Sequence, residues 1–242
     1  MSAFRLDKII CDSGIATRSE ARLMITAGRV RIDGKTETRA DLKIELDDSE
    51  ICVDGNVING SKFRYFMLNK PEGVLTATED RQQKTVLDLM PEDLKRLKIF
   101  PVGRLDKDTT GLLILTNDGE FCHAVTSPKR HIKKLYEFTV EGMLLPEDVD
   151  AFKSGITLRD GTECLPAILE IDENNLSRGR VSICEGKYHQ VKRMLASRGK
   201  TVVKLNRITV GELKLDSSLK PGSYREIDKN EIKLVLMGNV SK

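Results

Sequence analysis

The chain has 242 residues, of which 39% are hydrophobic, 32% are charged and 5% are aromatic. It is too long for a disulfide-bonded miniprotein and too apolar for a disordered tail, so we expect one or two ordinary folded domains. Forty Lys and Arg against thirty-seven Asp and Glu leave a formal charge of +3, which neither establishes nor excludes an anionic partner.

No segment of the sequence suits a membrane. The longest purely apolar run is about four residues, Leu112 to Leu115, against the roughly 20 that a membrane-spanning helix needs. The N-terminus turns charged before a signal-peptide core could form, so we expect a cytoplasmic protein. Five cysteines occur singly, without the paired spacing of a zinc or redox site, and we interpret them as reduced and mostly buried.

Two short helices are predicted at the start of the chain. Apolar residues recur at helical spacing over residues 6–10, and a Ser-Gly break follows them. Thr17 or Ser19 can cap a second helix, and Gly28 stands where a glycine commonly ends one. Beyond it, short alternating segments up to residue 53 predict small strands, the first of which ends in a tight turn at Asp33-Gly34.

The second predicted helix is basic. Arg18 and Arg22 lie four residues apart and share one helix face, which by itself also fits a solvated surface helix. Together with the segments 5–8 and 28–34, however, the pattern resembles the S-four RNA-binding domain over roughly residues 5 to 50. In that family the second helix and the turn after it contact RNA phosphates, which implies that Arg18, Arg22 and Arg29 bind RNA.

A domain boundary is predicted near residue 60. Acidic residues, including Asp47 and Asp48, crowd the end of the first segment, and Asn59-Gly60-Ser61 has the composition of a hinge. We therefore expect an S-four-type domain over residues 1–60 and a larger domain over residues 61–242.

The larger domain opens with a predicted strand over residues 65–70. Pro71 cannot continue the hydrogen-bond ladder, so Asn69 and Lys70 are presented at a strand end. Functional groups are common at such positions, which makes both residues candidates for RNA binding. The alternative is an ordinary strand end with a solvated lysine.

Residues 103–119 are the most informative stretch. Their second half reads as a buried aliphatic strand closed by an Asn-Asp-Gly turn. Their first half is a loop that carries Arg104, Asp106 and Asp108 directly before that strand. A polar loop leading into a buried strand would hold Asp106 on a rigid support, as a reacting group requires, whereas Asp108 could simply initiate a turn.

Three ordered motifs resemble the RsuA/RluB/RluE/RluF family of ribosomal-RNA pseudouridine synthases. They are Gly103-Arg104-Leu105-Asp106, the upstream segment 66–71 and the downstream segment 185–194. The resemblance implies an α+β fold, in which the S-four-type domain precedes a catalytic domain with a mixed, mostly antiparallel sheet flanked by helices. It also implies isomerisation of uridine to pseudouridine, a reaction without a redox step or a group donor, so we expect no cofactor and no metal.

The resemblance assigns catalytic roles to four residues. Asp106 is the essential carboxylate, acting on the sugar as nucleophile or as base. Lys192 matches a basic position that pairs with this carboxylate and keeps it charged, although a surface lysine on an RNA-facing helix is the alternative. Tyr136 stacks on the target uracil, or is an ordinary core tyrosine. Arg104 fills the gap left by the flipped nucleotide or binds its phosphate.

Two basic stretches flank these motifs and contain Lys129, Arg130, Lys187 and Arg193. Such stretches are usually solvated, but their position favours a track for RNA phosphates. The three histidines show no metal spacing, and we expect His189 to cap the helix that follows it rather than to take part in catalysis.

Several segments, among them 64–71 and 185–194, most resemble the RsuA branch, which modifies small-subunit 16S RNA. We therefore expect a monomeric enzyme whose partner is ribosomal RNA, free or in an assembling small ribosomal subunit. Three alternatives stay open. They are a non-catalytic RNA-binding ribosome-assembly factor, a 23S rRNA pseudouridine synthase, and a hydrolytic glycosidase that uses Asp106 and Asp108 as a carboxylate pair.

Overall fold

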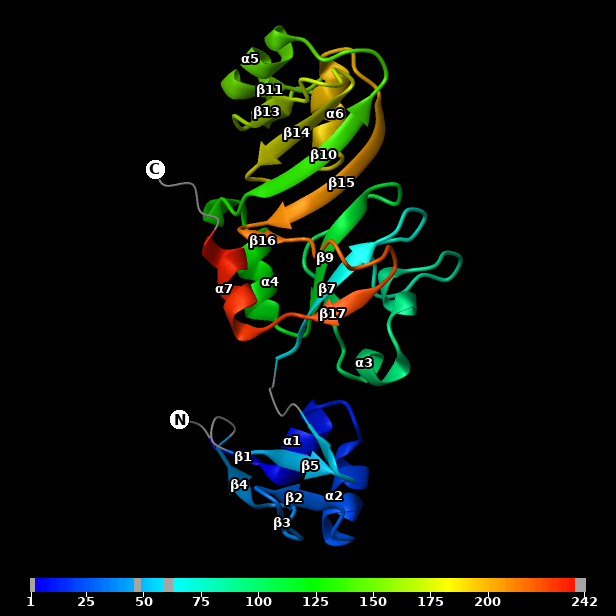
Figure 1. Cartoon of the computed structure of the whole chain (residues 1–242), viewed down its shortest axis with the longest axis vertical. Helices are drawn as coiled ribbons and strands as arrows, with labels where there is room; N and C mark the ends of the chain where they lie inside the picture. Colours follow the sequence, from blue (N-terminus) through cyan, green and yellow to red (C-terminus); the bar gives the residue numbers. More distant parts are fainter. Residues whose placement is uncertain (1–2, 46–48, 59–62, 238–242) are drawn as a thin grey trace. The chain divides into compact units, whose positions relative to one another are not determined.

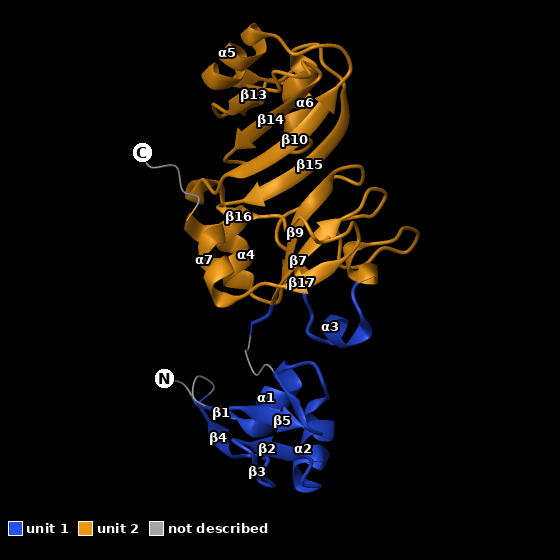
Figure 2. Ribbon diagram, viewed as in Figure 1, with its two compact units in different colours: residues 1–64, 90–99 blue, residues 65–89, 100–242 orange. Residues whose placement is uncertain are grey.

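The computed structural model describes residues 3–45, 49–58 and 63–237. The chain forms two compact units, one of residues 1–64 with 90–99 and one of residues 65–89 with 100–242 (Figure 2). No sequence signal indicated that residues 90–99 belong with the N-terminal unit. The expected hinge at Asn59-Gly60-Ser61 and the pair Asp47-Asp48 lie outside the described residues, so the division at residue 60 stays a prediction.

The N-terminal unit combines short helices with small antiparallel sheets (Figure 1). One sheet has the strand order β3-β2-β5-β6, and β1 pairs with β4 separately. Leu6, Ile10, Ile25 and Val30 are fully buried in its core. Its elements are β1 (Phe4–Arg5), α1 (Leu6–Asp12), α2 (Arg18–Thr26), β2 (Val30–Ile32), β3 (Lys35–Thr36), β4 (Lys43–Ile44), β5 (Ile51–Val53), β6 (Asn56–Val57) and α3 (Glu92–Arg96).

Local sequence signals account for the start of α2 and for the turn after β2. The Thr17 hydroxyl accepts a hydrogen bond from the Glu20 amide, and the Glu20 carboxylate accepts one from the Thr17 amide, which forms a capping box. Thr17 rather than Ser19 is therefore the cap. Asp33 and Gly34 have φ angles of +49° and +79°, the pair of positive values that a type I′ hairpin turn requires.

Packing of residues 90–99 in the N-terminal unit depends on a glycine. A Cβ atom at Gly14 would lie 2.9 Å from the Leu97 side chain and 3.0 Å from the Asp93 carbonyl oxygen. Both contacts are tight, and Gly14 has a φ angle of +84°, so glycine suits the close approach of the turn after α1 to this segment.

The second unit is built on a nine-stranded sheet. Its strands are β7 (Tyr65–Lys70), β8 (Phe100–Pro101), β9 (Thr110–Thr116), β10 (Lys134–Val140), β13 (Ile168–Ile171), β14 (Arg178–Ile183), β15 (Val202–Val210), β16 (Leu213–Lys214) and β17 (Tyr224–Glu226). A two-stranded sheet of β11 (Ile156–Thr157) and β12 (Glu163–Cys164) accompanies it. The helices are η1 (Val86–Leu89), α4 (Gly119–Thr126), η2 (Pro128–Arg130), α5 (Pro146–Ser154), α6 (Gln190–Ser197) and α7 (Lys229–Met237).

The main path of the large sheet runs β13-β14-β10-β15-β9-β7-β17. Strands β15 and β9 are parallel, whereas the neighbours on both sides pair antiparallel. At the parallel junction, a Cβ atom on Gly111 would collide with the backbone of Arg207, so glycine is required there. The expected mixed, mostly antiparallel sheet and the α+β fold are confirmed.

Helices cover different parts of this sheet (Figure 1). Helices α4 and α7 pack on the half that contains β9, where Leu112 and Ile114 share a core with Phe121 and Val235. Helix α5 packs beside β13, and α6 packs beside β11 and β15. The predicted buried aliphatic strand is therefore β9, and its turn leads into α4, whose first amides are capped by the Asp118 carboxylate.

The cysteines are free, but the expectation that they are mostly buried is wrong. Cys164 is buried, whereas Cys11, Cys52, Cys122 and Cys184 are partly exposed. Cys11 and Cys122 lie on the short helices α1 and α4, each of which also carries other residues that are not buried, Cys52 lies on the short strand β5, and Cys184 follows the end of β14. Within residues 3–45, 49–58 and 63–237, no helix has the length and apolar character needed to cross a bilayer.

Candidate active site

Asp106 lies in the loop between β8 and β9, which is anchored from two sides. The Thr76 hydroxyl donates to the Leu105 carbonyl oxygen at 2.7 Å and accepts from the Leu105 amide at 3.2 Å. On the other side, the ammonium group of Lys70 donates to the carbonyl oxygens of Pro71, Lys107 and Thr109 at 2.9–3.1 Å. The loop is thus fixed immediately before and after Asp106.

The prediction that Lys70 binds RNA is wrong. Its side chain is fully buried, because the three carbonyl groups replace the water that a lysine at a strand end would otherwise contact. Burial lowers the pKa of Lys70 to about 8. The strand-end position was correctly inferred, but the ammonium group points into the protein and supports the loop.

Two basic side chains approach the Asp106 carboxylate from α6 and the segment before it. Lys192 Nζ lies 3.3 Å from Asp106 Oδ2, and His189 Nε2 lies 3.4 Å from Asp106 Oδ1. The Asp106 side chain is 26% exposed, so one carboxylate oxygen lies beside an ammonium group and the other beside an imidazole ring, and neither is sealed from solvent.

Lys192 is shared between two carboxylates. Its ammonium group also lies 2.5 Å from Asp108 Oδ1, closer than to Asp106. This hydrogen bond holds the pKa of Asp108 below its usual range. Helix α6 fixes Lys192 by burying Val191, Met194 and Leu195 on its inner face, as predicted.

His189 does not cap α6, contrary to expectation. His189 is the residue directly before the helix, and its backbone has a left-handed conformation with φ +49° and ψ +34°. Its side chain makes no capping hydrogen bond. The ring faces Asp106 instead. This residue was missed by sequence reasoning because a Tyr-His-Gln segment before a helix gives no sign of a backbone turn that redirects the ring.

Tyr136 and Arg104 border the same cavity as Asp106. Tyr136 is 8% exposed and lies on the face of β10 that also buries Phe138 and Val140, as the alternation predicted. Arg104 is exposed. The cavity has a volume of about 70 Å³, well below the roughly 300–1,000 Å³ of pockets that enclose a drug-sized ligand. It can hold only part of a nucleotide.

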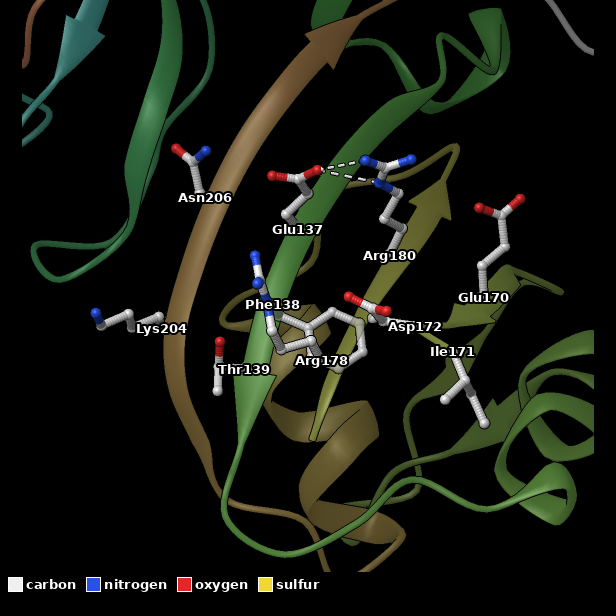
Figure 3. A pocket seen from close by; sticks show the side chains of 11 residues that line it. Glu137, Phe138, Thr139, Glu170, Ile171, Asp172, Arg178, Arg180, Lys204 and Asn206 are labelled. Atoms are coloured by element: carbon white, nitrogen blue, oxygen red, sulfur yellow. Dashed lines mark hydrogen bonds and ion pairs between the residues drawn. The ribbon is translucent and has the colours of Figure 1, made fainter. Parts of the chain in front are cut away.

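A larger cavity of about 450 Å³ lies elsewhere in the second unit (Figure 3). It is bounded by β10, β13, β14 and β15, and its lining carries three basic and three acidic side chains, Arg178, Arg180, Lys204, Glu137, Glu170 and Asp172. Arg180 already pairs with Glu137 across two strands at 2.8 Å. Balanced charge of this kind is typical of a solvated sheet face, so volume alone does not identify the site.

The arginines expected to bind RNA in the N-terminal unit are partly engaged within it. Arg18 and Arg22 form ion pairs with Asp7 at 3.3 and 3.0 Å, and Arg5 adds a third at 3.1 Å. Burial raises the pKa of Asp7, but the hydrogen bonds from Arg5, Arg22 and Arg18 outweigh it and hold the pKa well below its usual range. The arginine side chains remain 39–53% exposed, so they can still reach an RNA phosphate.

Most other predicted RNA-binding residues also have partners within the protein. Arg29 pairs with Asp54, Lys187 with Glu185, and Arg193 with Asp160. The Asn69 amide donates to the Leu219 carbonyl oxygen at 2.7 Å. Lys129 and Arg130, in η2, are by contrast exposed, and no hydrogen bond or ion pair of their side chains is found among the described residues.

The second basic stretch, which begins at Lys187, also includes Arg207, but this residue cannot lie on a phosphate track. It is 3% exposed, and its guanidinium group donates to the Leu112 carbonyl oxygen at 2.8 Å. Alternation along β15 turns it into the sheet junction, because Lys204 and Asn206 occupy the opposite face. In the described part of the chain, no group of three His, Cys, Asp or Glu side chains could hold a metal ion.

Fold and site together define an enzyme with an RNA-binding module and an accessible carboxylate beside an aromatic ring. Residues 64–197 match the family model of RNA pseudouridylate synthase, and residues 4–51 match the S4 domain. A solved structure described as pseudouridylate synthase aligns with a TM-score of 0.68 and 37% sequence identity, covering 96% of this chain and 99% of the other.

Two curated relatives align with this chain over nearly their whole length. An uncharacterized RNA pseudouridine synthase of Bacillus subtilis (strain 168), YtzG, is 42% identical over 96% of this chain and 98% of its own length. The ribosomal small subunit pseudouridine synthase A of Escherichia coli (strain K12) is 38% identical over 96% of this chain and 100% of its own. The chain belongs to the RNA pseudouridylate synthase family, so the expected enzyme class and the N-terminal RNA-binding module are confirmed.

Proposed function

We propose that this pseudouridine synthase isomerises one uridine of 16S ribosomal RNA, with Asp106 as the group that acts on the sugar. The observation that carries the proposal is the Asp106 carboxylate, 26% exposed at the mouth of a cavity beside Tyr136, with Lys192 and His189 against its oxygens. The Escherichia coli relative named for the small ribosomal subunit supports the choice of RNA.

The reaction breaks the bond between the sugar C1′ and uracil N1 and forms a bond between C1′ and C5. The proton on C5 is lost and N1 gains one, so the mass of the RNA does not change. Asp106 acts either as nucleophile toward C1′ or as base toward the sugar, and both roles need its ionised form. The Lys192 ammonium group favours that form by its positive charge.

The neighbouring residues have distinct tasks in this proposal. Tyr136 stacks against the flipped uracil, and Arg104, exposed beside it, binds the phosphate or fills the vacated space in the RNA. Lys70 is a positioning residue, since it holds the carbonyl groups of Lys107 and Thr109 next to Asp106 without reaching the substrate. Precise placement of a reacting group contributes strongly to rate.

RNA is bound mainly by charge in this account. Lys129 and Arg130 contact phosphates near the catalytic unit, and Arg18, Arg22 and Arg29 keep enough exposure to do so from the N-terminal unit. The protein acts in the cytoplasm as a monomer, on free ribosomal RNA or on an assembling small subunit. Light scattering at the mass of one chain, 27.1 kDa, tests the monomer.

The glycosidase alternative is weakened by the charge state of its carboxylate pair. A glycosidase needs one of two carboxyl groups protonated as a general acid. Here both Asp106 and Asp108 contact Lys192, and its hydrogen bond lowers the pKa of Asp108. The lowered pKa keeps Asp108 ionised and leaves it unsuited to the role of general acid.

The test uses 16S and 23S transcripts made without modification, incubated with the purified protein and mapped for pseudouridine. One isomerised site in 16S RNA, with unchanged mass, is expected. An isomerised site only in 23S RNA would favour the other subunit, and binding without any isomerised base would favour an assembly factor. Release of free uracil would favour the glycosidase.

A further inference from the structure

A stacked pair of rings stands beside Asp106 and has no task in the proposed chemistry. The rings of Tyr188 and His189 lie 3.8 Å apart with an interplanar angle of 19°. Tyr188 is 75% exposed, a high value for an aromatic side chain, which normally buries most of its surface. His189 borders the cavity that contains Asp106, so the pair extends from the reacting carboxylate out to solvent.

The segment that carries this pair is held firmly. The Glu185 carboxylate is buried and accepts hydrogen bonds from the Leu165 amide at 2.9 Å, from Gln190 Nε2 at 2.6 Å and from Lys187 Nζ at 2.7 Å. The Gln190 side chain in turn accepts from the Lys187 amide at 3.0 Å. Exposure of Tyr188 is therefore not the consequence of a loosely attached loop.

The backbone at His189 also points to a specific task. A left-handed conformation costs a residue other than glycine about 1 kcal/mol or more, and such strain is often found at functional sites. Here it leaves the first turn of α6 without a side-chain cap and turns the imidazole toward Asp106, with the Tyr188 ring stacked on it.

We propose that the Tyr188–His189 pair is a stacking platform for the nucleobase adjacent to the target uridine. The inference rests on the proposed function. Flipping a nucleotide removes the stacking partner of its neighbour, and the cavity of about 70 Å³ has no room for a second base. The open face of Tyr188 offers that neighbour an aromatic surface within the same site, and base stacking on aromatic side chains tolerates any base.

The experiment compares Tyr188→Ala with the matched control Tyr188→Phe, which keeps the ring. The substrate is the 16S fragment in which the wild-type protein forms pseudouridine, and steady-state kinetics separate kcat from KM. Tyr188→Ala should raise KM by roughly 5- to 100-fold, the equivalent of about 1–3 kcal/mol, with kcat within about twofold. Tyr188→Phe should match the wild type.

A second substrate identifies the base. In fragments with an abasic residue on the 5′ or the 3′ side of the target uridine, one of the two should raise the wild-type KM and abolish the difference between wild type and Tyr188→Ala. An unchanged KM for Tyr188→Ala overturns the platform, as does a loss that persists in both abasic fragments.

Failure of the platform can be distinguished from failure of the proposed function. If the wild-type protein forms no pseudouridine in 16S RNA, the function fails, and the platform is then tested by equilibrium binding of a uridine-containing single-stranded oligonucleotide with fluorescent 2-aminopurine beside the uridine. Weaker binding by Tyr188→Ala than by Tyr188→Phe supports the platform. Equal binding overturns it.

Discussion

Each unit of the molecule contains a carboxylate beside basic side chains, and the two carboxylates differ in how much of each stays accessible. Asp7 is completely buried, and three arginines donate to its oxygens. Asp106 is 26% exposed and is approached by Lys192, which it shares with Asp108, and by His189. Asp7 therefore joins α1 and α2, whereas Asp106 keeps lone pairs that a substrate can reach.

The comparison shows that residue types alone do not distinguish a structural ion cluster from a reactive one. In both places a carboxylate on a firmly held segment lies beside basic side chains. Exposure and unused hydrogen-bonding capacity decide the role, because a carboxylate whose acceptor sites are filled has nothing left to offer a substrate.

The difference between the two carboxylates is tested most strongly by removing the charge of Lys192 beside Asp106. Lys192→Met keeps most of the length of the side chain but deletes its charge, so we expect turnover to fall by at least about 10²-fold, a size typical for loss of an electrostatic partner in an active site. Lys192→Arg restores the charge and should recover part of the activity. Similar turnover in Lys192→Met and wild type would show that Asp106 needs no cation.

The matched change in the N-terminal unit should alter stability instead. Asp7→Asn leaves the three arginines without their carboxylate and should lower the free energy of unfolding by about 3 kcal/mol, the low end for a broken buried ion pair, since the arginines are half-exposed. Urea unfolding measures the change. Turnover per folded molecule should stay near the wild-type value, and a selective loss of turnover would contradict the structural role.

The pH dependence of unfolding tests whether Asp7 stabilises the fold in its ionised form. The pKa of Asp7 is lower in the folded protein than the ordinary 3.8, so its contribution to stability is fully present above about pH 5 and is lost as pH falls further. The stability difference between wild type and Asp7→Asn should therefore shrink below pH 4.

Lys70 should produce a smaller effect, through position. Lys70→Met leaves three carbonyl groups beside Asp106 without a donor, and we expect turnover to fall by about 10-fold while RNA affinity is retained. Burial lowers the pKa of Lys70 to about 8, from 10.5 in the unfolded chain. Above pH 8 the neutral amine has two N–H groups for three carbonyls, so wild-type turnover should decline there, whereas Lys70→Met should not show this step.

The same pKa shift makes stability change with pH in the opposite direction to turnover. Folding disfavours the charged form of Lys70, so its contribution to the free energy of unfolding increases as pH rises from about 8 toward 10.5. Turnover that declines while stability increases would separate positioning from unfolding.

The smallest effect is expected at η2. Lys129→Ala with Arg130→Ala should weaken RNA binding several-fold and reduce the slope of log K against log salt by about 1 to 2, because each lost phosphate contact contributes roughly 0.7 to 0.9. Lys129 and Arg130 report on RNA binding more cleanly than Arg18 and Arg22 do. Removal of Arg18 and Arg22 would also leave the buried Asp7 without two of its ion-pair partners. An unchanged slope would show that Lys129 and Arg130 do not contact RNA phosphates.

The sequence predicts those features that depend on neighbouring residues. The start of α2 follows from Thr17 and Glu20, three residues apart, and the inner face of α6 follows from helical spacing. Strand β9 follows from an unbroken aliphatic run. These are local signals, and the position of Asp106 in the loop directly before such a strand could be inferred from them.

Contacts between distant segments were not predictable in this way. Lys70 and Arg207 look like surface cations in the sequence, and only the folded sheet shows that carbonyl groups from other segments surround them. The same applies to Asp7, two of whose three arginine partners come from α2, and to His189, which a single backbone conformation directs toward Asp106. Pairing across the chain, rather than composition, decides whether a charge is buried.

The most direct test of the central claim is a single turnover on RNA that carries tritium at C5 of the target uridine, since forming the new carbon–carbon bond releases that hydrogen. We expect wild type and Asp108→Asn to release tritium, and Asp106→Asn to release none while its RNA dissociation constant stays within about twofold. Tritium release by Asp106→Asn at the wild-type rate would contradict the assignment of the reacting carboxylate.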